Sequence, residues 1–291
     1  MMSGNAIRWS ALGGSVRGAS HLRNGLPNQD AREFHDESPW LLALADGHGS
    51  ARSFRSDSGA KFAVELANAL GPNFPTDGNP STVKQWVEHD LPRELVRQWC
   101  ARVDVGIESE PFSDEQRQIL GLKTDNEPRA RLAYGATLLL VVATDSFIFY
   151  LQLGDGDILT VSASGKVTRP LPKDERLIAN ETTSLCMDKA WNEVRTGFQV
   201  IANDPPALIL AATDGYANAF RDEASFQQVG TDLLRLLREE GPEFIKDNLE
   251  NWLNETSDVG SGDDITVGLL YRADALDTTE PDARPTTPET P

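Results

Sequence analysis

The chain contains 291 residues, of which 39% are hydrophobic and 25% charged, as is typical of a soluble globular protein. Its 45 acidic residues outnumber its 27 basic residues, and the net charge of −18 disfavours binding to nucleic-acid phosphates or to anionic membranes. Cys100 and Cys186, the only cysteines, form no CxxC pair, so neither a thiolate metal site nor a disulfide framework is expected.

The termini and the apolar runs predict a cytoplasmic protein with one folded domain. Residues 1–9 lack the long apolar core of a signal peptide, and no apolar run approaches the roughly 18 residues that a membrane-spanning helix needs. Residues 273–291 are rich in Thr, Pro and acidic side chains and are predicted to be a disordered tail. No linker-like break precedes this tail, so residues 1–272 are expected to form a single domain.

In the N-terminal half, predicted strands are followed by amphipathic helices. Residues 7–12 and 40–45 are apolar runs typical of strands, and a polar loop over 13–31 follows the first of them. Helices are predicted where apolar residues recur every three or four positions. The predicted helices are 57–70, 81–103 with a kink at Pro92, and 114–120.

The C-terminal half begins with three predicted strands, 133–143, 147–153 and 158–161. Because the turns between them are short, they favour an antiparallel meander. Strands and helices then mix without strict alternation, which favours an α+β fold over a doubly wound parallel sheet. The remaining predicted strands are 197–202, 207–212 and 265–271, and the remaining predicted helices are 226–238 and 242–253.

Acidic turns adjoin the ends of four predicted strands. A carboxylate beside a buried strand end is costly unless it is paired or coordinated, and several of them at one sheet edge could hold hard divalent cations. A single Asp-Gly pair is ordinary turn chemistry, so the indication of a metal site rests on the four turns together. The acids in these turns are Asp46, Asp155 with Asp157, Asp214, and Asp263 with Asp264.

His48 follows Asp46 by two residues and gives a separate indication of chemistry. An imidazole beside a metal ligand can serve as a general acid near neutral pH. Without the acidic turns, an exposed turn histidine would be the simpler interpretation.

Five short motifs occur in an order that resembles the type 2C metal-dependent serine/threonine protein phosphatases. The opening segment, from Arg17-Gly18-Ala19-Ser20-His21 to Gly25-Leu26-Pro27-Asn28-Gln29-Asp30-Ala31, is similar to a bacterial branch of that family. The resemblance covers residues 16–271. The motifs are Asp46-Gly47-His48-Gly49, Gly135-Ala136-Thr137, Leu153-Gly154-Asp155-Gly156-Asp157, Ala212-Thr213-Asp214-Gly215 and Asp263-Asp264-Ile265-Thr266-Val267.

The resemblance implies two packed antiparallel β-sheets flanked by helices, a four-layer α-β-β-α sandwich with metals in a cleft at one edge. Asp46 would bridge two Mg²⁺ or Mn²⁺ ions, and the Gly47 carbonyl would complete the coordination of one of them. Asp214 and Asp263 would bind the other ion. Asp30 would hold a coordinated water in the second shell, and Asp155 would contribute to a third, weaker metal site.

The resemblance also implies the reaction. Water activated by two metals would attack the phosphorus of phosphoserine or phosphothreonine directly, and His48 would protonate the leaving oxygen. The substrate would be a phosphorylated protein, with a separate serine/threonine kinase acting in opposition. Two alternatives remain open: a non-catalytic module that binds phosphoproteins, and a phosphatase for small phosphorylated metabolites.

Three positions bear on how far the family pattern applies. Many members carry an arginine five residues before the position of Asp30, whereas this chain has Gly25, so His21 and Arg23, then Arg17, are the candidate phosphate ligands. Asn218 replaces a frequent acid and weakens a third metal site. Asp264 stands where many members have Asn, which leaves the choice between Asp263 and Asp264 open, with the motif favouring Asp263.

Residues 173–191 fall where the family places a mobile flap beside the active site. This polar segment is predicted to contact the substrate, with an ordinary surface excursion as the alternative.

Overall fold

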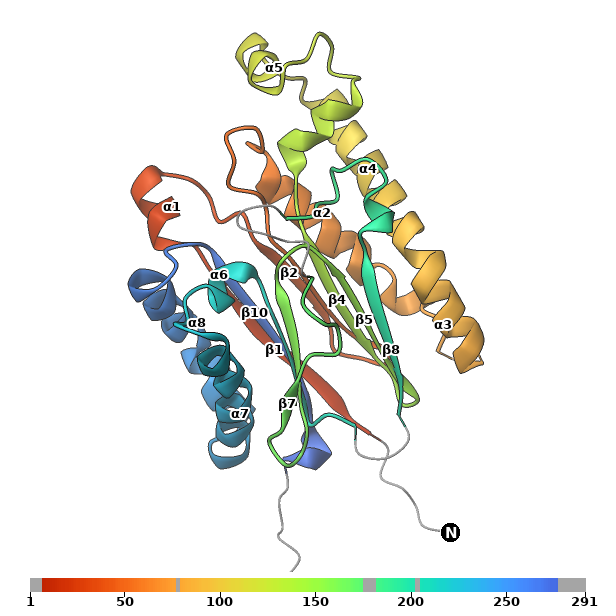
Figure 1. Ribbon diagram of the computed structural model, residues 1–291, viewed down its shortest axis with the longest axis vertical. Coiled ribbons are helices and arrows are strands. Elements are labelled where there is room, and N and C mark those ends of the chain that lie inside the picture. Colours follow the sequence, from red (N-terminus) through yellow and green to blue (C-terminus); the bar gives the residue numbers. More distant parts are fainter. Residues whose placement is uncertain (1–6, 77–78, 175–181, 202–204, 277–291) are drawn as a thin grey trace, which may run out of the picture.

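The computed structural model describes residues 7–76, 79–174, 182–201 and 205–276. Two five-stranded sheets pack face to face, and helices cover both outer faces (Figure 1). All the strand pairs are antiparallel, which confirms the predicted α+β sandwich. Of the expected tail, Ala273–Ala275 forms a short 3-10 turn and residues 277–291 lie outside the described residues.

The first sheet has the strand order β1-β10-β9-β6-β7, and helices α7 and α8 lie on its outer face. Two short helices, α1 and α6, lie at one end of it. The bounds are β1 Trp9–Val16, β6 Asp157–Val161, β7 Val167–Thr168, β9 Leu208–Ala212, β10 Ile265–Arg272, α1 Ala19–Asn24, α6 Asp214–Ala217, α7 Glu223–Glu239 and α8 Pro242–Val259.

The second sheet has the order β2-β3-β4-β5-β8, and its outer face is covered by α2, which packs against α4. Helix α3 contacts the edge strand β8, and α5 projects beyond the end of the sheet. The bounds are β2 Ala31–His35, β3 Trp40–Ala45, β4 Leu138–Ala143, β5 Phe147–Leu153, β8 Arg195–Val200, α2 Ser56–Asn68, α3 Pro80–His89, α4 Leu91–Ser109 and α5 Asp114–Leu120.

The central strands are apolar on both faces because each face is buried. In β3, Leu41 and Ala43 face the helices, whereas Leu42 and Leu44 pack against the other sheet. Strand side chains alternate between faces, so a strand buried on both sides becomes one continuous apolar run. None of the described helices has the length and apolarity needed to cross a bilayer.

The predicted meander is wrong at its third strand. β4 and β5 form a hairpin, but β6 pairs with β9 in the first sheet. The chain changes sheets at Gly154, whose φ of 106° is a conformation that glycine adopts without steric cost. The connection that carries Asp155 therefore spans the two sheets at the edge of the sandwich.

Several other boundaries also differ from the predictions. The predicted helix 81–103 is two helices, α3 and α4, because Pro92 lacks an amide hydrogen and is accommodated in the first turn of α4. The edge strand β2, residues 31–35, begins at the last residue of the predicted loop 13–31. The loop itself contains the end of β1 and the whole of helix α1. The 3-10 segment Pro128–Tyr134 replaces the start of the predicted strand 133–143.

Candidate metal centre

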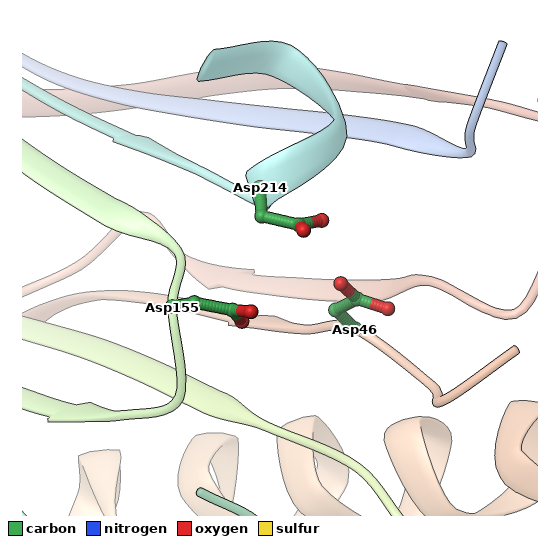
Figure 2. A group of neighbouring side chains, drawn as sticks. All are labelled: Asp46, Asp155 and Asp214. Atoms are coloured by element: carbon green, nitrogen blue, oxygen red, sulfur yellow. The ribbon is translucent and has the colours of Figure 1, made fainter. Parts of the chain in front are cut away.

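Acidic side chains from both sheets meet at one edge of the sandwich. Asp46 directly follows β3 and Asp155 follows β5 in the second sheet, while Asp214 opens α6 after β9 in the first sheet. Each of these three offers a carboxylate oxygen, and the three oxygens lie within 4.8 Å of one another. Figure 2 shows the three side chains pointing toward a common space.

The negative charges of the carboxylates in this cluster repel one another. The pKa of Asp46 is raised well above its ordinary value, first by burial and then by the negative charges of Asp30 and Asp214. The pKa of Asp214 is raised to about 6 by burial and by the charge of Asp155. A divalent cation would remove this repulsion, and a donor set made only of carboxylate oxygens suits Mg²⁺ or Mn²⁺.

Asp30 lies beside the cluster and is held by the first sheet. It accepts a hydrogen bond of 2.8 Å from the Thr213 hydroxyl, one residue before Asp214. Burial raises the pKa of Asp30 to about 8, with smaller contributions from the charges of Asp264 and Asp214. Asp30 thus links the start of β2 to the turn that carries Asp214.

Two backbone pairings fix the Asp46-Gly47-His48 turn. The Asp46 amide donates to the Thr137 hydroxyl at 2.9 Å, and the Thr137 amide donates back to the Asp46 carbonyl at 2.8 Å. Gly47 forms an isolated bridge with Ala136. The turn that carries Asp46 is therefore anchored to the segment that leads into β4.

Gly135 permits the position of the His48 ring. The His48 amide donates to the Gly135 carbonyl at 3.0 Å, and a Cβ atom at residue 135 would lie only 2.5 Å from His48 Cδ2. Burial lowers the pKa of His48, and the charge of Asp155 partly opposes this shift. The imidazole consequently favours its neutral form before any ligand is present.

Asp263 and Asp264 have different surroundings. Asp264 is 4% exposed, and its two carboxylate oxygens accept amide hydrogens from Gly18 and Gln29 at 2.6 Å each. The Asp263 side chain is 53% exposed, and its charge acts on both Asp46 and Asp214. Asp263 is therefore the more accessible of the two carboxylates, and it lies outside the group of three whose oxygens are within 4.8 Å of one another.

The residues predicted to bind phosphate lie on and beside α1. His21 is 8% exposed; its Nδ1 lies 2.8 Å from Asp264 Oδ2 in an ion-pair contact that lacks good hydrogen-bond geometry. Arg23 is exposed. Arg17 Nη2 donates to the His21 carbonyl at 3.1 Å, while its buried Nε meets no acceptor among the described residues. Gly25, with φ of 70°, ends the helix.

Asn218 is engaged with the cluster, which the sequence did not indicate. Its side-chain amide donates to Asp214 Oδ2 at 3.0 Å. Four residues separate them, so the first turn of α6 brings the amide over the carboxylate. This contact occupies one lone pair of the Asp214 carboxylate.

Comparisons with known proteins agree with this arrangement. The sequence model of the protein phosphatase 2C family matches residues 17–254, a range that includes Asp30, Asp46, Asp155 and Asp214 and ends before Asp263. The chain belongs to the protein phosphatase 2C family, so the resemblance found in its motifs is confirmed. No curated protein sequence matches the chain.

Solved bacterial phosphatase structures share the fold. The catalytic domain of the serine/threonine phosphatase PstP, in complex with two manganese ions, has a TM-score of 0.55 and 17% identity over 91% of this chain and 98% of that one. PppA of Pseudomonas aeruginosa has a TM-score of 0.58 and 15% identity over 91% and 98%. Stp1 of Staphylococcus aureus has a TM-score of 0.56 and 15% identity over 93% and 97%.

Proposed function

We propose that this protein hydrolyses phosphoserine and phosphothreonine in phosphorylated proteins with the help of two divalent cations. The observation that carries the proposal is the convergence of the Asp46, Asp155 and Asp214 carboxylates within 4.8 Å. Three acids held so close in a partly buried cleft are strongly unfavourable without a cation. Membership of the protein phosphatase 2C family supports the same reaction.

The acids of the cleft fit Mg²⁺ or Mn²⁺. Asp46 and the Gly47 carbonyl would hold one ion, and Asp46, Asp214 and Asp263 the other. Asp155 would help to hold a third, weaker ion. The Asn218 amide, which donates to Asp214, would compete with that ion for the Asp214 carboxylate. Bound ions would supply activation of water and neutralisation of charge on the phosphoryl group.

The residues of the chain then have distinct tasks. Asp30, fixed by the Thr213 hydroxyl, orients the attacking water. His48, in its protonated form, donates a proton to the seryl or threonyl oxygen as the P–O bond breaks, which releases phosphate and the alcohol. No covalent intermediate is required.

Arg23 is the more accessible of the two predicted phosphate ligands. Its guanidinium is exposed and suits bidentate contact with phosphoryl oxygens. The His21 ring is enclosed beside Asp264, which favours a positioning role for it. A serine/threonine kinase encoded separately would generate the substrate.

The test is release of phosphate from a phosphothreonine peptide and from p-nitrophenyl phosphate, with and without Mn²⁺. Both activities should require Mn²⁺ and should be lost in Asp46→Ala and Asp214→Ala. Full activity in either variant would refute the site assignment. Binding of phosphopeptides without any turnover would instead support the non-catalytic module.

A further inference from the structure

A pocket of about 400 Å³ opens directly beside His48. Its walls are formed by the turn that follows His48, by Leu132 before β4, and by residues 182–187 after β7. Residues 175–181 of the predicted flap lie outside the described residues. The volume is at the low end of the range of about 300–1,000 Å³ for ligand pockets, so it suits one or two side chains.

The wall formed by residues 182–187 is anchored to the segments that carry Asp46 and Asp155. The Leu185 amide and the Ser184 hydroxyl both donate to the Ala136 carbonyl, at 2.9 Å and 3.1 Å. The Gly154 amide donates to the Thr183 hydroxyl at 2.9 Å. Because Ala136 pairs with Gly47 and Gly154 precedes Asp155, the wall is fixed relative to the cleft.

The opposite wall is also held in place. The Ser53 amide donates to the Ser50 carbonyl at 2.8 Å, and their hydroxyls lie 3.0 Å apart. The Gly135 amide donates to the Leu132 carbonyl at 3.2 Å. These bonds form the pocket before any substrate arrives, so binding requires little ordering of the protein.

The pocket is lined by apolar side chains together with the small hydroxyl side chains of Ser50, Ser53, Thr182 and Ser184. Leu132, Cys186 and Met187 line the pocket, and Met187 is 42% exposed. Burial raises the pKa of the Cys186 thiol, which therefore remains uncharged at neutral pH. Covering these surfaces with an apolar side chain would remove them from water.

The position of the pocket identifies its occupant. His48 would protonate the oxygen of the phosphorylated residue, so that residue must stand within hydrogen-bond reach of the imidazole. Consecutive Cα atoms of a peptide are about 3.8 Å apart. The residue next to the phosphorylated one is therefore the group that reaches the pocket.

We propose that this pocket is a specificity subsite for an apolar side chain adjoining the phosphorylated residue of a polypeptide substrate. The inference rests on the proposed phosphatase function and narrows its substrate class. Arg52 adds a second expected preference to this subsite. Arg52 is exposed at the rim and makes no ion pair with the described part of the chain, in a protein of net charge −18. It would attract an acidic residue of the substrate.

The test uses phosphothreonine peptides that differ only in the residues flanking phosphothreonine, which are Leu, Gly or Lys. The wild-type protein should have a kcat/KM about tenfold higher for the Leu peptide than for the Gly peptide. Met187→Asp should abolish this preference and favour the Lys peptide. Hydrolysis of p-nitrophenyl phosphate, which leaves the pocket empty, should change less than about twofold.

Val200→Asp is the matched control, because Val200 is 54% exposed and lies at the end of β8 far from the cleft. It should keep the wild-type preference. A wild-type protein that does not distinguish Leu from Gly would overturn the proposal. Equal losses on peptides and on p-nitrophenyl phosphate in Met187→Asp would also overturn it, by showing a structural role.

A second pair of peptides tests Arg52. One carries Asp and the other Lys beyond the flanking Leu, and Arg52→Glu should reverse the wild-type preference for Asp, whereas the exposed Arg93→Glu on α4 should not. Unchanged preference in Arg52→Glu would contradict this part. If p-nitrophenyl phosphate is cleaved but small metabolites are far better substrates than any peptide, the subsite and the protein substrate are refuted, and only the metal-dependent phosphatase activity survives. Absence of all hydrolysis would refute both.

Discussion

His21 Nδ1 lies 2.8 Å from Asp264 Oδ2, at a carboxylate that also accepts the amide hydrogens of Gly18 and Gln29. The Asp264 side chain thereby joins the start of β10 to α1 and to the segment before Asp30. The Gln29 carbonyl in turn accepts from the Gly47 amide at 3.1 Å. Asp264 therefore connects the peptide segments that carry Asp263, Asp30 and Asp46.

Asp264→Asn should destabilise the protein by about 1–3 kcal/mol, because the amide group offers only one acceptor oxygen for two buried N–H donors. It should also weaken Mn²⁺ binding, since the ligand segments lose their common anchor. Thermal unfolding and Mn²⁺ titration measure the two effects. Asp258→Asn, at an exposed position of α8, is the control. Wild-type stability and affinity in Asp264→Asn would show that the contact is incidental.

The metal-free protein should lose stability as the pH rises from about 6 to 8. Asp30 has a pKa of about 8 in the folded state, against an ordinary value of 3.8, and Asp214 has a pKa of about 6. A carboxyl group whose folded pKa is raised stabilises the fold while protonated, and this contribution disappears as pH rises through the folded pKa. The expected loss is about 1–2 kcal/mol, measured by chemical denaturation in EDTA.

Two comparisons test whether the carboxyl groups of the cluster cause this pH dependence. Asp30→Asn should flatten the pH dependence of the metal-free protein, because the amide does not ionise. Added Mn²⁺ should raise the unfolding temperature more at pH 8 than at pH 6. A metal-free stability that rises over this interval would contradict the electrostatics of the cluster.

The leaving group of the substrate should determine how far the loss of His48 lowers kcat. His48→Gln should lower kcat for a phosphothreonine peptide by about 10²–10⁴-fold, because an alkoxide needs a proton as it leaves. The effect on p-nitrophenyl phosphate should be small, since nitrophenolate leaves without protonation. Since burial lowers the pKa of His48, the ratio of peptide to aryl rates should also fall as pH rises. Equal losses on both substrates would argue against a proton donor.

Asn218→Asp should strengthen binding of an additional ion. The change removes the amide donor to Asp214 and adds a negative charge beside it. Asn218→Ala removes the donor without adding charge and is the matched control. Mn²⁺ titration should show tighter binding in the Asp variant than in the Ala variant, and equal affinities would exclude a role for this position.

The sequence predicted best those elements whose local pattern decides their structure. β3, β5 and α5 have the predicted bounds, because the strands are continuous apolar runs and the helix begins at a Ser113 capping box and ends at Gly121. The edge strand β2 was missed. Its half-buried residues, including Arg32 and Glu33, carry no apolar run.

The sequence predicted less well which segments distant along the chain lie together in the fold. The acids at strand ends could be recognised from Asp-Gly turns, but no local feature reveals that β6 crosses to the other sheet. Likewise, the motif favours Asp263 over Asp264 without fixing the choice, because the amides of Gly18 and Gln29 that bind Asp264 lie more than 230 residues away. Their hydrogen bonds to Asp264 are tertiary contacts that no local pattern reveals.

Calorimetric titration of Mn²⁺ into the wild-type protein and into Asp46→Asn is the decisive test of the metal site. We expect two ions to bind to the wild-type protein and the binding heat to be lost in Asp46→Asn, because that carboxylate would contact both ions. Asp258→Asn should bind as the wild-type protein does. Absence of Mn²⁺ binding to the wild-type protein, or unchanged binding in Asp46→Asn, would contradict a metal-dependent phosphatase centred on this cluster.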